Sequence, residues 1–295
     1  MSTTSAAPPA PLPARRSLRG RRRKQASAWA FKYAALLFFA AVVLTPLYVL
    51  LVASFKGTAE ADPSNAWSLP DLWTVEAWRE AWSQLLPNLK NSLYLVLPAT
   101  VISTIVGSLN GFVLSRWRFP GSDVVFTFLL FGMFIPYQAV MIPLTQLFAD
   151  VDFPTGIPRL AFAHIVYGIP ITTLIFRSYY ATIPEDLIEA ARMDRAGMLR
   201  TYWSVVLPLS APAFVVTAIW QFTSIWNDFL FAVFLITDPT KWPVTVALNN
   251  TTGSLVTPYN LQMSAALLAS LPTLVVYILL GRYFIRGLMA GALKG

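Results

Sequence analysis

The chain has 295 residues, of which 56% are hydrophobic and only 12% are charged, and its mean hydropathy is +0.58. Soluble domains carry about 25% charged residues, so this composition excludes an ordinary globular enzyme and favours a membrane protein with several spans. The sequence has no cysteine, which excludes disulfides, thiol catalysis and cysteine metal ligands, and most of the net charge of +8 lies in one N-terminal block.

The N-terminal segment 1–32 is basic and rich in proline. Its composition predicts a disordered cytoplasmic tail that sets the orientation of the chain in the membrane. Nucleic-acid binding is a weaker alternative, because no folded basic domain accompanies the charges, and we expect no nucleic-acid partner. A cleaved signal peptide is another alternative, but the apolar run from Tyr33 to Phe55 is long for one and lacks a small-residue cleavage site.

Apolar runs long enough to cross a bilayer follow the tail. Each contains a proline, which is tolerated in membrane helices when neighbouring groups satisfy the freed carbonyl. The pattern predicts an all-α membrane protein with six transmembrane helices between residues 33 and 286 and a cytoplasmic tail over 287–295. We place the spans near 33–55, 93–114, 124–144, 160–180, 211–235 and 262–285.

The Lys and Arg residues between the spans predict the orientation. With a cytoplasmic N-terminus, seventeen of the 22 fall on the inner side and five on the outer side, so both termini are expected in the cytoplasm of a cell-membrane protein. The first outer loop is acidic and rich in tryptophan. Its piece "TVEAWREAW", with Thr74 as N-cap, predicts a short helix on the outer surface.

The segment between the fourth and fifth spans is charged and cytoplasmic in this topology. Thr182 and Glu185 have the spacing of a capping box at a helix start. Gly197 is expected to end this first helix, and a second helix is expected from Arg200 to Val206. The pattern therefore predicts a helix-turn-helix pair that leads directly into a membrane span.

In the same segment, Glu189, Ala190 and Ala191 are followed at fixed spacing by Val205 and by Leu207-Pro208. This pattern, with the same spacing, resembles the EAA loop of ABC-importer permeases. Arg195 stands where the family has glycine, so Gly197 is expected to supply the turn. The resemblance implies that this pair is a coupling helix pair that seats in a cleft of an ATPase subunit. The residues assigned to this contact are Glu189, Ala190, Ala191, Asp194, Arg195, Gly197, Leu207 and Pro208. The alternative is an ordinary amphipathic helix lying on the membrane.

The C-terminal sequence "RYFIRGLMAGALKG" is similar to the ending of maltose-type (MalG-like) carbohydrate permeases. Within that group it looks most like the glucose/mannose type. In that group the tail reaches the ATPase interface. The resemblance implies a contact through Gly287, Gly291, Lys294 and Gly295. The alternative is a frayed end after the last helix.

Polar residues inside the spans usually face the interior of a helix bundle. Asp228 is the only acidic residue that we place within a span. Amide and carboxylate groups can bind sugar hydroxyls, and an indole can stack on a sugar ring. The alternative is hydrogen bonding between helices. His164, the only histidine, is expected to be structural rather than a metal ligand. The candidate substrate-pathway residues are Gln138, Gln221, Trp226, Asn227 and Asp228.

The chain contains no P-loop sequence, so the energy for transport must come from another subunit or from an ion gradient. We therefore expect a non-catalytic permease subunit of an ATP-driven sugar importer that forms half of the translocation pathway. The chain itself is expected to bind no cofactor or metal, while ATP and Mg²⁺ are used by two partner ATPase subunits. The other expected partners are a second permease subunit in a heterodimer, an extracytoplasmic solute-binding protein, the sugar and the lipid bilayer. A homodimer of this chain is the alternative to the heterodimer, and it is less like the carbohydrate permeases. The alternatives are an ion-coupled secondary transporter, which should carry several intramembrane ionisable residues and inverted repeats, and a membrane enzyme, which should show a catalytic cluster.

Overall fold

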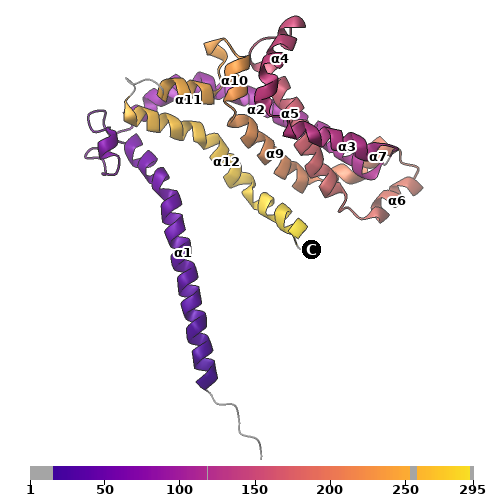
Figure 1. The fold of residues 1–295 in the computed structure, drawn as a ribbon, viewed down its shortest axis with the longest axis horizontal. Helices are drawn as coiled ribbons and strands as arrows, with labels where there is room; N and C mark the ends of the chain where they lie inside the picture. The colour runs from indigo at the N-terminus through magenta and orange to yellow at the C-terminus, as the bar shows by residue number, and fades with distance from the viewer. Residues whose placement is uncertain (1–15, 118, 253–257, 293–295) are drawn as a thin grey trace, which may run out of the picture.

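The computed structural model describes residues 16–117, 119–252 and 258–292, and every regular element in these ranges is helical (Figure 1). Short 3-10 turns (η1, η2 and η4) and one π-helical turn (η3) join the α-helices. In chain order the elements are α1 (Arg16–Ser54), η1 (Pro63–Asn65), α2 (Glu76–Arg116), α3 (Ser122–Phe131), η2 (Gly132–Phe134), α4 (Tyr137–Asp150), α5 (Ile157–Tyr180), α6 (Glu185–Met193), α7 (Met198–Thr201), η3 (Tyr202–Val206), α8 (Leu207–Leu209), α9 (Ala211–Trp226), α10 (Leu230–Leu235), η4 (Pro239–Lys241), α11 (Val244–Thr252) and α12 (Tyr259–Ala292).

Within these ranges, four helices are long and apolar enough to cross a bilayer: α1 from Ala28 onwards, α2, α5, and α12 as far as Tyr283. Two bent pairs also qualify if each pair forms one span. Helices α3 and α4 meet at an angle of 97°, and the α7–α8 segment meets α9 at 78°. The described chain is therefore all-helical with four to six candidate spans.

Helices α2 and α5 form the centre of the bundle and pack along their length, and α9 and α12 pack against α2. Small residues allow this approach. A Cβ atom added to Gly107 would lie 2.1 Å from Thr172 Oγ1, and one added to Gly111 would lie 2.6 Å from Phe176 Cβ. The core around these helices includes Leu95, Val96, Ala99, Leu160, Ile225 and Ala265.

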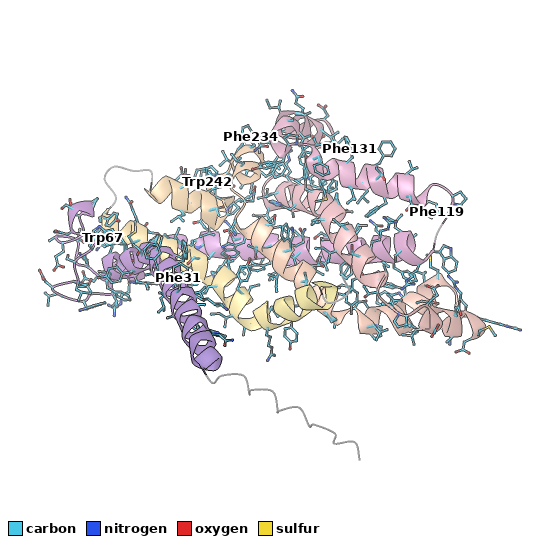
Figure 2. The ribbon with its side chains drawn as sticks, turned by 60° about the horizontal axis from the view of Figure 1, so that its bottom comes forward. Phe31, Trp67, Phe119, Phe131, Phe234 and Trp242 are labelled. Atoms are coloured by element: carbon cyan, nitrogen blue, oxygen red, sulfur yellow. The ribbon has the colours of Figure 1, made fainter. Side chains whose placement is uncertain are left out.

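Large apolar side chains cover the outside of the bundle. Phe31 on α1 is 78% exposed and Phe131 on α3 is 66% exposed, and both project from the surface (Figure 2). Helix α1 contacts α12 near its own C-terminal end, where Ser264 Oγ donates to the Ser54 carbonyl at 3.1 Å. The preceding turns of α1 extend away from the rest of the bundle (Figure 1). Apolar exposure on this scale suits lipid or another membrane subunit rather than water.

The N-terminal tail differs from the sequence-based prediction. Helix α1 begins at Arg16, so the disordered segment expected over 1–32 is helical in its second half. The remainder, residues 1–15, lies outside the described residues. A helical basic segment continuous with an apolar span keeps backbone hydrogen bonds that an extended tail would leave to water.

The short surface helix predicted near Thr74 is also wrong as a separate element. Helix α2 begins at Glu76 and runs unbroken for 41 residues to Arg116, which corresponds to about 60 Å. Thr74 makes no cap; its backbone N–H donates to the Phe55 carbonyl at 2.8 Å. Ala77, Ala81 and Leu85 are buried at helical spacing, so this first part of α2 packs against protein rather than lying on a membrane surface.

The predicted spans 124–144 and 211–235 are not continuous helices. Pro136 disfavours a helical conformation at the preceding residue, and Ile135 has φ −73° and ψ 116°, which separates α3 and η2 from α4. The second span is interrupted after Trp226, and α10 restarts at Leu230. These two breaks lie beside the cavity described below.

Candidate functional site

The segment that resembles the EAA loop, hereafter the coupling segment (residues 185–208), lies at the end of the bundle remote from α4, α10 and α11 (Figure 1). Helix α6 follows α5 after a short turn. The predicted capping box is wrong: α6 begins at Glu185 after Pro184 with no side-chain cap, and Thr182 Oγ1 donates instead to the Tyr179 carbonyl at 2.7 Å. Pro184 lacks an N–H and starts the helix by its own backbone geometry.

Arg116, the last residue of α2, binds the turn between α5 and α6. Its Nε donates to the Tyr180 carbonyl at 3.0 Å, its Nη2 donates to the Ile183 carbonyl, and its Nη1 pairs with the Glu185 carboxylate. The Arg116 side chain is 10% exposed. A planar guanidinium with several simultaneous acceptors fixes orientation as well as position, so α6 is attached firmly to the end of α2.

The end of α6 shows why Arg195 is accepted where the resembled family has glycine. The Arg195 N–H donates to the Arg192 carbonyl and the Ala196 N–H donates to the Ala191 carbonyl, both at 2.9 Å. These two bonds form a Schellman motif, which requires a left-handed residue after the cap. Arg195 has φ +57° and supplies that conformation itself. The prediction that Gly197 makes this turn is therefore wrong.

Gly197 instead precedes the second helix of the pair, with φ −69° and ψ 170° at the N-cap of α7. That helix starts at Met198, earlier than the predicted Arg200, and continues as the π-helical turn η3. Leu207 and Pro208 begin α8 directly after this turn. π-Helical turns are rare and frequently lie at functional sites, and this one lies shortly before the 78° bend into α9.

The two faces of α6 differ in exposure. Ile188 and Ala191 are buried against the bundle, whereas Glu189, Ala190 and Asp194 are exposed. Of the two small residues in the EAA triplet, only Ala190 is free for close approach by a partner. Ile188 belongs to a buried apolar cluster that joins α6 to the ends of α2, α5 and the η3 turn; its members are Phe112, Phe176, Tyr180, Ile183, Ile188, Tyr202, Val206 and Ala213.

Hydroxyl groups crosslink the helices behind this apolar cluster. Ser108 Oγ lies 2.6 Å from the Tyr180 hydroxyl and 2.7 Å from the Tyr202 hydroxyl. Ser210 Oγ donates to the Tyr180 hydroxyl at 3.2 Å. Buried hydroxyls satisfied by one another specify a single arrangement. The network therefore links α2, α5 and η3 to the residue at which the chain bends into α9.

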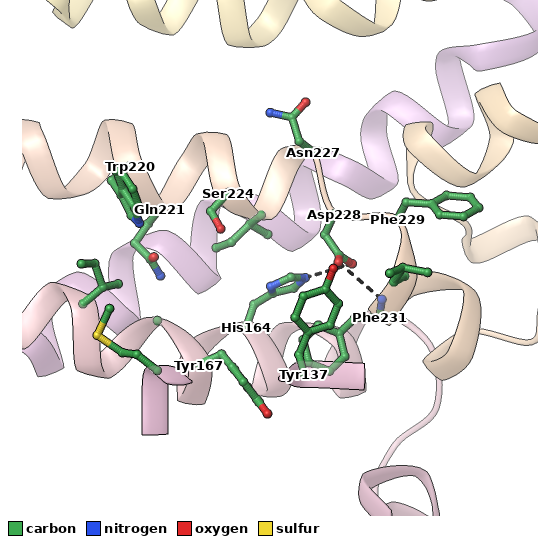
Figure 3. Close-up of a pocket in the computed structure, with 15 residues that line it drawn as sticks. Tyr137, His164, Tyr167, Trp220, Gln221, Ser224, Asn227, Asp228, Phe229 and Phe231 are labelled. Carbon is green, nitrogen blue, oxygen red and sulfur yellow. Dashed lines mark hydrogen bonds and ion pairs between the residues drawn. The ribbon is translucent and has the colours of Figure 1, made fainter. Parts of the chain in front are cut away.

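A cavity of about 520 Å³ lies at the other end of α9, beside both helix breaks (Figure 3). Aromatic rings line much of it, and its polar residues come from α5, α9 and the break after α9. Phe231 packs against the rings of Tyr137 and Tyr167, each with ring centroids 5.3 Å away. The other lining residues are Met133, His164, Gly168, Ile171, Trp220, Gln221, Ser224, Ile225, Asn227, Asp228, Phe229 and Leu230.

Asp228 occupies the break between α9 and α10. Its Oδ2 accepts the Ala232 N–H at 3.1 Å and its Oδ1 accepts the Phe231 N–H at 3.4 Å, so the carboxylate caps α10. The Nε2 atom of His164 on α5 lies 3.4 Å from Asp228 Oδ2 (Figure 3). The structure thus brings together the only histidine of the chain and the acidic residue singled out from the sequence.

The predicted pathway residues divide into two groups. Gln221, Asn227 and Asp228 line the cavity. Trp226 does not: its ring stacks on Phe222, and its Nε1 donates to the Ala269 carbonyl at 3.0 Å, so the expected stacking on a sugar is replaced by packing against α12. Gln138 is exposed and lies outside the cavity lining.

The structure describes only some of the residues assigned to the predicted C-terminal contact. Gly287 and Gly291 lie in the last turns of α12, whereas Lys294 and Gly295 lie outside the described residues.

Several residues of these sites were not expected from the sequence. Arg116 gives no local signal, because its partners are 64 to 69 positions away. Tyr137, Tyr167 and His164 reach the cavity only through the packing of α4 and α5. Gly107 and Gly111 did carry a signal, since glycines four positions apart in an apolar helix favour close helix packing.

The described residues form helices as their only regular elements, with several apolar spans, an exposed helix pair fixed at one end, and a cavity at the other end of α9. These are features of a membrane transport subunit. Residues 99–289 match the family described as the binding-protein-dependent transport system inner membrane component. The chain therefore belongs to this family of ABC transporter permeases, whose members are transport components.

Relatives and a solved structure agree with this membership. The chain is 50% identical over 165 residues to a probable ABC transporter permease protein of Pyrococcus horikoshii, a match that covers 56% of this chain and 60% of that protein. It is 33% identical over 265 residues to the glucose import system permease protein GlcU of Saccharolobus solfataricus, covering 88% of this chain and 92% of that one. The fold resembles a chain of a bacterial ABC transporter involved in the import of alginate, with a TM-score of 0.74, 23% identity, and coverage of 93% and 100%.

Proposed function

We propose that the chain is one permease subunit of an ATP-driven sugar importer and forms half of its translocation pathway. The observation that carries this proposal is the coupling segment. It is exposed on the face that bears Glu189 and Ala190, and it is anchored on the opposite face by Ile188 and by Arg116. Because the coupling segment is anchored in this way, a partner that displaces it also displaces α2 and α5.

In this proposal the partners are two ATPase subunits on the inner side, a second permease subunit and a solute-binding protein on the outer side. The α6 helix seats in the ATPase, with Glu189 paired to a cation and Ala190 allowing close approach. Closure of the ATPases moves α6, and the movement reaches the α7–α9 bend through the Tyr180 and Tyr202 hydroxyls. ATP and Mg²⁺ belong to the partners in this scheme.

The membrane arrangement that we propose has six spans with both termini in the cytoplasm. The excess of Lys and Arg at the end that bears the coupling segment supports this orientation. The two bent pairs each count as one span, which also puts α6 and the start of α2 on opposite sides of the bilayer. The acidic loop before α2 then faces the solute-binding protein.

Sugar is the substrate class that the cavity and the relatives favour. A mixture of aromatic rings with amide, hydroxyl and carboxylate groups suits a neutral molecule with many hydroxyls. A related permease of similar length is named for glucose import. The sugar itself would be delivered by the solute-binding protein.

The test is to purify the tagged chain from native membranes and to reconstitute the purified assembly in liposomes. We expect an ATPase and a second permease to co-purify, and sugar uptake to require internal ATP in the presence of the binding protein. Uptake that persists without ATP and stops when a protonophore collapses the ion gradient would instead support an ion-coupled transporter.

A further inference from the structure

The cavity between α4, α5, α9 and α10 has the size and composition of a ligand site. Its volume of about 520 Å³ falls within the range of roughly 300 to 1,000 Å³ that small-molecule sites occupy. Trp220 and Ser224 are exposed at the cavity on one turn of α9. Phe231 and its two flanking tyrosines form a rigid aromatic wall on the other side (Figure 3).

His164 and Asp228, which line the same cavity beside the aromatic wall, have unused hydrogen-bonding capacity. The His164 side chain is 9% exposed, and its Nε2 has no hydrogen-bond partner in the described part of the chain, because the contact with Asp228 at 3.4 Å lacks hydrogen-bond geometry. A buried polar atom without a partner is unfavourable, because it has given up its hydrogen bonds to water and gained none in the protein. A site that keeps such an atom is therefore prepared for a ligand that supplies the missing partner.

Asp228 also retains acceptor positions. A carboxylate offers about four lone-pair sites, and the Phe231 and Ala232 N–H groups use one site on each oxygen. The capping bonds hold the carboxylate in one orientation, so its remaining lone pairs are fixed in direction. Figure 3 shows His164 directed at this carboxylate from α5, whereas the Asn227 side chain points away from both.

We propose that this cavity is a binding subsite for a neutral sugar, held by Asp228 and His164 through two adjacent hydroxyl groups. One hydroxyl donates to the Asp228 carboxylate, and its neighbour hydrogen-bonds His164 Nε2. A hydroxyl both donates and accepts, so it satisfies Nε2 whether or not that nitrogen carries the proton. The apolar face of the sugar ring lies against Tyr137 or Tyr167, whose rings have an apolar body and a polar tip. The proposal rests on the function proposed above and adds that this subunit itself contacts the sugar.

Charge decides which sugars the subsite takes. Among the described residues that line the cavity there is no Lys or Arg to neutralise an acidic sugar. A sugar carboxylate would instead lie near the Asp228 carboxylate, and like charges in a partly desolvated site repel strongly. The cavity therefore selects neutral sugars over uronic acids.

The competing interpretation is that Asp228 serves only to start α10, with His164 as a packing neighbour. The absence of cysteine from the chain allows a direct test. In the assembled transporter, Ser224→Cys introduces a thiol at the cavity, and Ser83→Cys makes the same change at an exposed position on α2 outside it. Labelling of each thiol by a maleimide is followed on this chain with D-glucose, maltose, D-glucuronate or no sugar.

We expect D-glucose or maltose to slow labelling of the Ser224→Cys protein several-fold, and D-glucuronate to leave it unchanged. Labelling of the Ser83→Cys protein should not respond to any sugar. Equal protection of the two thiols, protection by D-glucuronate as strong as by D-glucose, or no protection by either neutral sugar would each overturn the proposal.

Two further substitutions, each added to the Ser224→Cys protein, separate sugar binding from helix capping. Asp228→Asn keeps one oxygen for the α10 N–H groups but removes the charge, and His164→Phe keeps the ring contact with Phe231 but removes Nε2. Each should abolish sugar protection while labelling without sugar keeps its rate. If protection survives in both variants, the pair does not hold the sugar. If Asp228→Asn prevents assembly, the His164→Phe protein decides the question alone.

The same preparation distinguishes failure of this subsite from failure of the proposed function. ATPase co-purification and ATP-driven sugar uptake report on the function independently of labelling. ATP-driven uptake without protection of Ser224→Cys would reject the subsite and leave the importer intact, whereas loss of both would reject the two proposals together.

Discussion

The Arg116 guanidinium at the end of α2 holds the carbonyl of Tyr180 at the end of α5, with Nε 3.0 Å from that oxygen. The two residues are 64 positions apart in the chain. Through this contact, and through the pairing of the same guanidinium with Glu185, helix α6 is attached to both central helices at once. Movement of α6 must therefore move α2 and α5 or break these bonds.

Replacing Arg116 by alanine should loosen α6 without preventing membrane insertion. The variant removes several charge-assisted hydrogen bonds, each with a contribution of about 1.5 to 3 kcal/mol. Loss of about 2 kcal/mol of local stability accelerates amide exchange roughly thirtyfold, since each 1.4 kcal/mol is a factor of ten. Hydrogen exchange over residues 185–196 measures the effect, and ATP-driven uptake should fall while ATP hydrolysis continues.

Arg177→Ala is the matched control, because Arg177 also pairs with an acid near the same end of the bundle. Its partner Asp123 is 85% exposed, so that pair contributes at most about 1 kcal/mol. If Arg116→Ala and Arg177→Ala change exchange and uptake equally, Arg116 has no special part in transmission.

Glu189→Lys should weaken the contact with the ATPase. Glu189 is exposed on α6, so reversing its charge leaves the packing of Ile188 and Ala191 unchanged but repels the cation that we expect across the interface. The recovered amount of ATPase per tagged chain should drop several-fold, and uptake should drop with it. Asp150→Lys makes the same charge reversal at the other end of the molecule and should have no such effect. Normal ATPase recovery with Glu189→Lys would remove the main support for docking through α6.

The left-handed backbone at Arg195 predicts that amide exchange at the end of α6 depends on which residue replaces the arginine. A left-handed backbone costs an ordinary L-residue about 1 to 2 kcal/mol, and Arg195 bears this at φ +57°. Arg195→Gly should therefore protect the amides of the α6 terminus from exchange at least as well as arginine does. Arg195→Val should expose them, because a β-branched side chain is least tolerant of this conformation. Equal protection in the valine and glycine variants would show that the turn relaxes to another conformation.

The sequence was sufficient for the features that depend on local pattern. Apolar runs identified the four continuous candidate spans. The spacing from Glu189 to Pro208 drew attention to the segment that contains α6, whose role in coupling stays a prediction. The interruption of the helix at Pro136 also has a local cause, because proline disfavours a helical conformation at the residue before it. A count of apolar residues alone does not detect this interruption. In each of these cases the cause lies within a few residues of its effect.

The sequence was not sufficient where the partner is distant in the chain or where a residue departs from its usual preference. Arg195 was expected to be unable to make a glycine turn, yet two backbone hydrogen bonds stabilise the strained conformation. His164 looked like an isolated structural histidine until the packing of α5 on α9 brought it to Asp228. Trp226 was assigned to the pathway by its neighbours in sequence, but a helix turns successive side chains about 100° apart, and its ring faces α12 instead.

The close packing of α2 on α5 gives the last prediction. A methyl group added at Gly111 would lie 2.6 Å from Phe176 Cβ and 2.8 Å from the Arg177 backbone nitrogen, and a backbone atom cannot move aside without shifting the helix. Gly111→Ala should therefore destabilise the assembled transporter by about 1 to 3 kcal/mol, seen as a lower midpoint in thermal unfolding followed by size-exclusion chromatography.

Gly281→Ala in α12 tests whether this loss comes from packing. A Cβ at Gly281 meets nothing within 4 Å, and alanine favours a helix over glycine by about 1 kcal/mol, so this variant should be as stable as the parent or more stable. Because α2 and α5 both contact the coupling segment through Arg116, forcing them apart at Gly111 should also lower uptake more than the stability loss alone explains. An unchanged unfolding midpoint with Gly111→Ala would mean that the two helices are farther apart in the working transporter, and the rigid link from α6 to the bundle would then need a different basis.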